Sequence, residues 1–145
     1  MTLSKIVQSV VLVRPRMQNK KLKVFIIAGE VSGDVLGGRI MACLPDVDFV
    51  GIGGENMAAA GLRSLFPMSD LAVMGIIEVL LHAKTLLRRV NETVSAIIQE
   101  KPNIVLTIDS PGFAKKVIHA LRKNPAGREL IANGMRFHHV VAPQV

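Results

Sequence analysis

Aromatic side chains are scarce in this 145-residue chain, which has neither tryptophan nor tyrosine and only five phenylalanines. Proteins that bind single-stranded nucleic acid usually stack bases on aromatic rings, so this composition argues against a nucleic-acid partner. Half of the residues are nonetheless hydrophobic and only 20% are charged. The composition therefore predicts a packed globular domain and no extensive disorder.

Cysteine and long apolar runs are scarce as well. A single cysteine, Cys43, excludes an internal disulfide framework, and we expect it to be a small buried residue in a reducing compartment. The longest apolar run, residues 71–81, has eleven residues and is interrupted by Glu78, whereas a membrane span needs about 20. Residues 1–21 are expected to form a variable N-terminal extension, and Met17 is an alternative start.

Two common signatures of chemistry are also missing. The segment "GEVSGD" departs from G-x-G-x-x-G, and no G-K-[ST] is present, so a dinucleotide or P-loop site lacks its fingerprint. The four histidines form no ligand set with other residues, because His138 and His139 fall on opposite faces of one predicted strand. We therefore expect no metal site.

Positive charge is in excess, with 18 Lys and Arg against 11 Asp and Glu, a formal net charge of +7. Such a surface suits phosphorylated substrates or anionic lipid. The basic residues are spread along the chain, so an ordinary solvated surface is the alternative interpretation.

The pattern that is present alternates strands with helices. Strands are predicted at 22–28, 48–54, 104–109 and 137–142, and helices at 33–44, 55–61, 76–100 and 112–123. The 76–100 segment has apolar residues spaced by three and four, as an amphipathic helix requires. This order predicts an α/β fold with a parallel, Rossmann-like sheet and helices on both faces.

Ligands of such sheets bind outside the carboxyl ends of the strands, and polar residues or glycines gather at three of these ends. They are Glu30, Ser32 and Asp34 after the first strand, Gly53, Gly54 and Glu55 after the second, and Asp109 and Ser110 after the third. A purely local role is the alternative for three of these side chains. Ser32 is placed to cap a helix, Asp34 to lie in its first turn, and Asp109 to accept a hydrogen bond in a turn.

Five segments of the chain stand out together: "AGEVSGDVLG" (28–37), "FVGIGGENMAAAGL" (49–62), "LAVMGIIEVL" (71–80), "KPNIVLTIDSPGF" (101–113) and "VVAPQV" (140–145). In this order they resemble segments of the lipid-A-disaccharide synthases. The resemblance implies the N-terminal, acceptor-side half of a two-domain GT-B glycosyltransferase over residues 22–145, truncated before a UDP-binding C-terminal domain. The chain departs from the family pattern at four positions, Asn103, Gly112, His139 and Ala142.

The implied reaction transfers 2,3-diacylglucosamine from UDP-2,3-diacylglucosamine to 2,3-diacylglucosamine 1-phosphate (lipid X). It forms a β-1,6 disaccharide and releases UDP, with inversion and without a metal or other cofactor. Inversion needs a base for the acceptor hydroxyl. The family motif makes Asp109 the first candidate, with Glu30 and Asp34 as runners-up.

The resemblance implies substrate contacts as well. Residues expected to shape the crevice or bind substrate are Gly29, Ser32, Gly33, Gly53, Gly54 and Ser110. An acyl-chain path is expected along Met74, Gly75 and Ile76, with Glu78 as a polar group within it. Core packing is the alternative for the apolar residues of this path, and a solvent-facing position is the alternative for Glu78.

The implied partners are the two lipid substrates, the missing C-terminal domain and an anionic membrane surface. We expect a peripheral protein on the inner, cytoplasmic face of the cytoplasmic membrane. Three alternatives stay open at this point: a non-catalytic nucleotide- or phosphate-binding module, an inactive truncated fragment, and a nucleotide-sugar epimerase-like domain.

Overall fold

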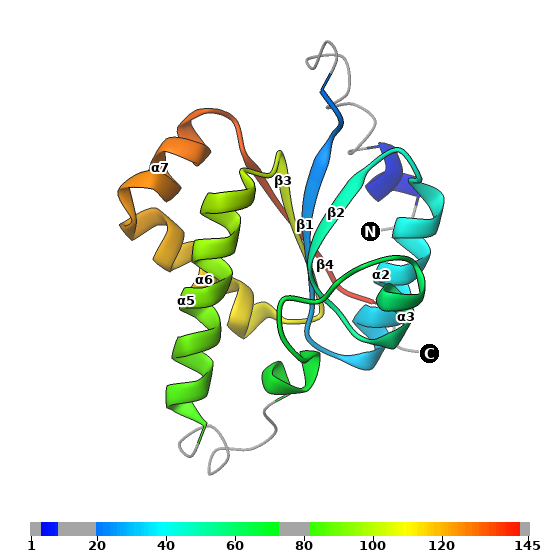
Figure 1. Ribbon diagram of the computed structural model, residues 1–145, viewed down its shortest axis with the longest axis horizontal. Coiled ribbons are helices and arrows are strands. Elements are labelled where there is room, and N and C mark those ends of the chain that lie inside the picture. Colours follow the sequence, from blue (N-terminus) through cyan, green and yellow to red (C-terminus); the bar gives the residue numbers. More distant parts are fainter. Residues whose placement is uncertain (1–3, 9–19, 73–81, 143–145) are drawn as a thin grey trace.

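The computed structural model describes residues 4–8, 20–72 and 82–142. Its centre is a sheet of four parallel strands in the order β2-β1-β3-β4 (Figure 1). The strands are β1 (Lys23–Ala28), β2 (Asp48–Ile52), β3 (Ile104–Ile108) and β4 (Arg136–Val140). Each overlaps a predicted strand, so the expected parallel α/β sheet is confirmed.

Helices cover both faces of this sheet (Figure 1). On one face lie α2 (Val31–Cys43) and α3 (Glu55–Ala59), and on the other α5 (Ala83–Glu100), α6 (Pro111–Lys123) and α7 (Pro125–Ala132). A short 3-10 helix, η2 (Met68–Leu71), precedes α5. Among the described residues, no helix is both long enough and apolar enough to cross a membrane.

The two faces of β1 belong to two separate cores. Val24, Ile26 and Ala28 pack with side chains of α2 and α3, whereas Phe25 and Ile27 pack with those of α5 and α6. This division follows from the alternation of side chains along a strand, and a strand buried on both faces reads as a continuous apolar run. Ile6, in the helical segment 4–8, is buried in the first core, so part of the predicted N-terminal extension packs against the domain.

Some local predictions were wrong. Helix α2 begins at Val31 rather than Gly33, and Cys43 is exposed rather than buried. The buried stripe of α2 runs along Gly33, Gly37 and Met41 at helical spacing, and Cys43 lies off it. Helix α7 was not predicted, although Asn124 caps it with bonds from the Ala126 and Gly127 N–H groups.

The amphipathic helix predicted at 76–100 is confirmed from Ala83 to Glu100. Its C-cap is Lys101, which has a left-handed backbone conformation with φ of 48°. The earlier part of this prediction, residues 76–81, lies outside the described residues.

Candidate functional site

The switch point of the sheet, where the sequence predicts a ligand crevice, lies between β1 and β3. These strands are neighbours, but the chain leaves β1 toward β2 and leaves β3 toward β4, in opposite directions. Ligands of open α/β sheets bind at such a switch point. The segments that follow these strands place Glu30 and Ser32 on one side of the switch point and Asp109 and Ser110 on the other.

Asp109 extends the pairing of β3 with β4 through its side chain as well as its backbone. Its backbone N–H donates to the Val140 carbonyl at 3.0 Å, as a regular parallel ladder requires. Its φ of 48° then turns the backbone out of the strand conformation. In a regular ladder the Ala142 N–H would next donate to the Asp109 carbonyl. It donates instead to Oδ1 of the Asp109 side chain, at 2.7 Å.

The other carboxylate oxygen of Asp109 faces α2. Ser32 Oγ donates to Asp109 Oδ2 at 3.0 Å, and Ser32 itself is exposed. The prediction that Ser32 caps α2 was wrong, because Glu30 occupies the N-cap position and α2 has no side-chain cap bond. The hydroxyl bridges the two sides of the switch point.

Two glycines allow this close approach. A Cβ on Gly29 would lie 2.4 Å from Ser110 Oγ, and a Cβ on Gly33 would lie 3.2 Å from the Ile108 carbonyl oxygen. A contact of 2.4 Å is sterically forbidden, so a larger residue at Gly29 would push the two loops apart. A contact of 3.2 Å at Gly33 is tight. Gly29 and Gly33 thus bring the start of α2 against the end of β3.

Asp34 lies on the other side of α2 from the Asp109 contact and bonds to the start of α3. Its side chain is 2% exposed and accepts four hydrogen bonds of 2.8–3.0 Å, from the N–H groups of Gly54, Asn56 and Met57 and from Asn56 Nδ2. Burial alone would raise the pKa of the Asp34 carboxyl, but the bonds from Asn56, Met57 and Gly54 outweigh it and hold the pKa below its ordinary value.

Asp34 is therefore built as a structural carboxylate that caps α3. Both oxygens are occupied by fixed donors, an arrangement that favours a structural role for Asp34 over proton transfer. Gly54 belongs to this cap, and Gly53 donates its N–H to Ser64 Oγ at 3.1 Å. These two glycines shape the turn after β2.

The family model of lipid-A-disaccharide synthetase matches residues 24–145. The chain belongs to the lipid-A-disaccharide synthase family. Among its relatives, the lipid-A-disaccharide synthase of Rhodospirillum centenum is 47% identical over 131 residues, covering 87% of this chain and 31% of the relative.

Other synthases of the family give similar values. Identity is 45% over 126 residues with the protein of Gluconobacter oxydans and 41% over 128 residues with that of Pseudomonas aeruginosa. These alignments cover 84% and 86% of this chain but 28% and 32% of the relatives. The chain thus spans about a third of the length of the synthases it matches.

Of the remaining predicted site residues, two lie at the starts of helices and four lie outside the described residues. Glu30 is exposed at the N-cap of α2, and Ser110 is half-buried at the N-cap of α6. Met74, Gly75, Ile76 and Glu78 lie outside the described residues. Within the described ranges, no three His, Cys, Asp or Glu side chains are grouped to hold a metal ion.

Sequence reasoning missed two features of this end of the sheet. One is the Ala142 N–H, a backbone group that only the pairing of β3 with β4 places beside Asp109. The other is a contact between Thr107 Oγ1 and His139 Nδ1 at 2.7 Å. It borders a largely apolar cavity of about 260 Å³ between α6 and β4.

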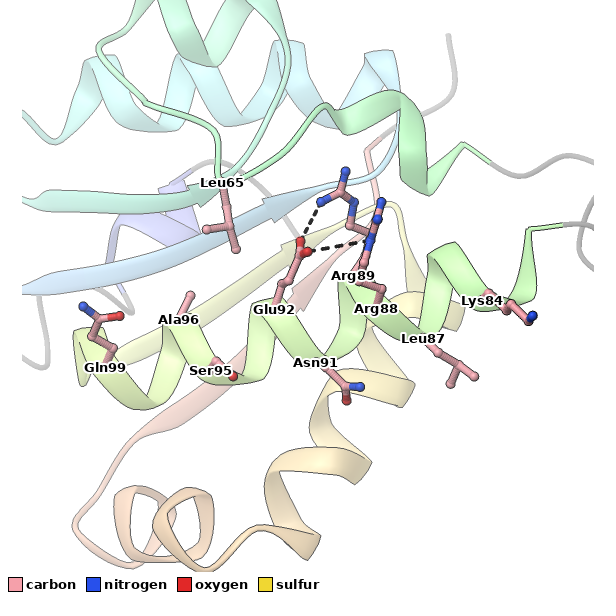
Figure 2. Close-up of a pocket in the computed structure, with 10 residues that line it drawn as sticks. All are labelled: Leu65, Lys84, Leu87, Arg88, Arg89, Asn91, Glu92, Ser95, Ala96 and Gln99. Atoms are coloured by element: carbon pink, nitrogen blue, oxygen red, sulfur yellow. Dashed lines mark hydrogen bonds and ion pairs between the residues drawn. The ribbon is translucent and has the colours of Figure 1, made fainter.

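A broader groove runs along the outer side of α5 (Figure 2). Leu65 and Leu87, which are 45% and 60% exposed, contribute its large apolar side chains, and Lys84 and Arg88 contribute positive charge. Arg89 is held in place by bonds to Asp70 and Glu92 and lies over the Phe66 ring. These contacts fix η2 and the loop before it against α5.

Proposed function

We propose that this chain supplies the acceptor side of a lipid-A-disaccharide synthase. The reaction would transfer 2,3-diacylglucosamine from UDP-2,3-diacylglucosamine to lipid X, giving the β-1,6 disaccharide and UDP. Family membership supports this reaction, and the carboxylate of Asp109 at the switch point is the observation that carries the chemistry. The family match also favours a synthase over an epimerase-like domain.

Asp109 is the proposed general base. Its Oδ1 is occupied by the Ala142 N–H, while Oδ2 accepts from Ser32 and has a second lone pair for a substrate hydroxyl. As the acceptor C6 hydroxyl attacks the donor C1, the new O–C1 bond forms and the bond from C1 to the UDP oxygen breaks. The hydroxyl proton passes to Oδ2. No step is assigned to a metal ion, and turnover should therefore persist in EDTA.

The surroundings of Asp109 suit an acylated sugar. Val31 and Val141 are 71% and 65% exposed, and each is the chain neighbour of a group that donates to the Asp109 carboxylate. Large apolar side chains in water cost free energy that contact with an acyl chain would recover. Exposed valines beside a polar site are consistent with an acceptor that is part sugar and part lipid.

The catalytic proposal can be tested in a full-length context. A chimera would carry residues 24–145 of this chain in place of the matching segment of the Rhodospirillum centenum relative. We expect it to form the disaccharide from UDP-2,3-diacylglucosamine and lipid X. A folded chimera without this activity would overturn the proposed function.

Two substitutions then separate chemistry from structure. Asp109→Asn keeps an oxygen for the Ala142 N–H but cannot take the proton, so kcat should fall about 10²–10⁴-fold while the fold is retained. Asp109→Ala loses both roles. Glu129→Gln, at an exposed position on α7, is the matched control. Near-normal turnover of Asp109→Asn would refute the assignment of the base.

We also propose that the amino end of α5 contacts an anionic membrane surface at the inner face of the cytoplasmic membrane. This end of α5 and η2 lie at the same end of the sheet as the start of α6, the end that carries Asp109 (Figure 1). Lys84 and Arg88 flank the exposed Leu87 there (Figure 2). Basic residues near an anionic surface contribute about 1 kcal/mol each.

Vesicle flotation tests this membrane contact. The chain should float with vesicles that contain about 30% anionic phosphatidylglycerol, and Lys84→Ala/Arg88→Ala should weaken binding about tenfold or more. Lys101→Ala/Lys123→Ala, which removes two exposed charges elsewhere, is the control for net charge. Equal loss in both double variants, or equal binding to neutral vesicles, would contradict the proposal.

A further inference from the structure

We infer that Ser32 is a positioning residue that fixes the orientation of the Asp109 carboxylate. This inference rests on the proposed function, because it assigns Ser32 a role through the base of that reaction. Resemblance to the family gave Ser32 only as a substrate-binding residue, and local rules gave it as a helix cap. The structure gives its hydroxyl a different partner, Asp109 Oδ2 at 3.0 Å.

One hydrogen bond cannot fix a carboxylate. The bond from the Ala142 N–H holds Oδ1 at 2.7 Å, but the plane of the carboxylate can still turn about the direction of that bond. Ser32 adds a second fixed point on the other oxygen. Together the two donors define both the position and the plane of the group, and one lone pair of Oδ2 is left for the substrate.

The position of Ser32 is itself well determined. Its neighbour Gly33 packs against the end of β3, where a Cβ would make a tight contact of 3.2 Å with the Ile108 carbonyl oxygen. Two residues along, Asp34 is tied to α3 by four hydrogen bonds. The first turn of α2 is therefore fixed on both sides. The Ser32 hydroxyl can for this reason hold the Asp109 carboxylate in one orientation, which an exchanging water molecule could not do.

Removal of the hydroxyl should leave the fold intact. Ser32 is exposed; its hydroxyl donates across the switch point, and α2 has no side-chain cap bond that the substitution could remove. Loss of a cap therefore does not accompany loss of this bond. The consequence of Ser32→Ala should be confined to the direction in which Oδ2 points.

The experiment uses the same chimera with the Rhodospirillum centenum relative, carrying Ser32→Ala, Ser32→Thr, Asp109→Asn or the double variant Ser32→Ala/Asp109→Asn. We expect Ser32→Ala to lower kcat about 10–100-fold, as misplacement of a catalytic group does, with the KM for lipid X changed less than about threefold. Ser32→Thr keeps the hydroxyl and should recover most of kcat. In the Asp109→Asn background, Ser32→Ala should have almost no further effect.

Each other outcome has a definite meaning. An unchanged kcat in Ser32→Ala, or an effect that appears only in the KM for lipid X, would overturn the positioning role while leaving Asp109 as the base. An effect of the same size in the Asp109→Asn background would also overturn it. Retained activity of Asp109→Asn would instead refute the proposed base. Urea unfolding of each variant, with Ser95→Ala on α5 as the matched control, separates these results from loss of folding.

Discussion

Replacing Asp34 with alanine should separate α3 from α2 and destabilise the whole domain. The side chain is buried, and its two oxygens receive three backbone N–H groups and one side-chain amide from residues 54–57. Alanine leaves all four donors without this acceptor. The Met57 N–H is the most serious loss, because its residue is fully buried and water cannot replace the bond.

The magnitude follows from these donors. A buried donor left unpaired costs about 1–3 kcal/mol, and loss of a carboxylate cap costs about 1 kcal/mol more. Alanine also removes the cost of burying the Asp34 charge, which offsets part of this loss of stability. We expect a loss of about 3 kcal/mol in the free energy of unfolding, a decrease in Tm of roughly 6–12 °C for a domain of this size.

Urea unfolding at neutral pH measures this loss, with Glu129→Ala as the exposed acidic control, expected to change stability by less than about 0.5 kcal/mol. Equal urea midpoints for Asp34→Ala and the unchanged chain would refute the reasoning.

The same side chain predicts a pH dependence. Because folding lowers the pKa of Asp34 below its ordinary value of 3.8, the unfolded chain takes up its proton first as the pH falls. The stabilisation is therefore complete above about pH 5 and is lost as the pH falls below 3.8 toward the folded-state pKa. Asp34→Asn should lack this component of acid destabilisation. A pH profile of stability identical to that of the unchanged chain would contradict it.

Three further predictions concern packing and capping. Gly29→Ala should lower the free energy of unfolding by about 1–3 kcal/mol, because the new Cβ would collide with Ser110. Gly112→Ala, whose Cβ would have no atom within 4 Å, should be neutral or stabilising. Thermal unfolding compares the two variants. Asn124→Ala should cost about 1 kcal/mol by uncapping α7, measured by urea unfolding. Arg89→Lys should lose the two-point contact with Asp70 and speed hydrogen exchange in η2; unchanged exchange there would contradict this.

Much of the sheet could be predicted because its strands are short apolar runs bounded by polar residues and glycine. Such runs are typical of strands buried on both faces, and helices between them force a parallel order. Helix α7 was missed even though "NPAG" carries a cap and a proline at the first helical position. This signal was present in the sequence and could have been used.

The site was predicted in outline but not in its contacts. The sequence placed Asp109 at the end of a strand. That its side-chain oxygen, rather than its main-chain carbonyl, accepts from the Ala142 N–H depends on the φ angle of Asp109 and on the pairing of β4. Asp34 shows the same limit. Its place in a first helical turn suggested a local role, whereas its partners lie 20 to 23 residues away in the chain. Local rules cannot distinguish a carboxylate that supports its own helix from one that supports another.

Because the Ala142 N–H donates to the Asp109 carboxylate, the orientation of the proposed base depends on the pairing of β4. With the register of Ile108 opposite Val140, the Ala142 N–H meets the carboxylate; a slip of one residue would present a different backbone group and reverse the faces of β4. The carboxylate is therefore aligned only after the last strand of this sheet, in chain order, has paired correctly. A misfolded sheet would hold the same residues in sequence but would lack an oriented Asp109 carboxylate, the proposed base.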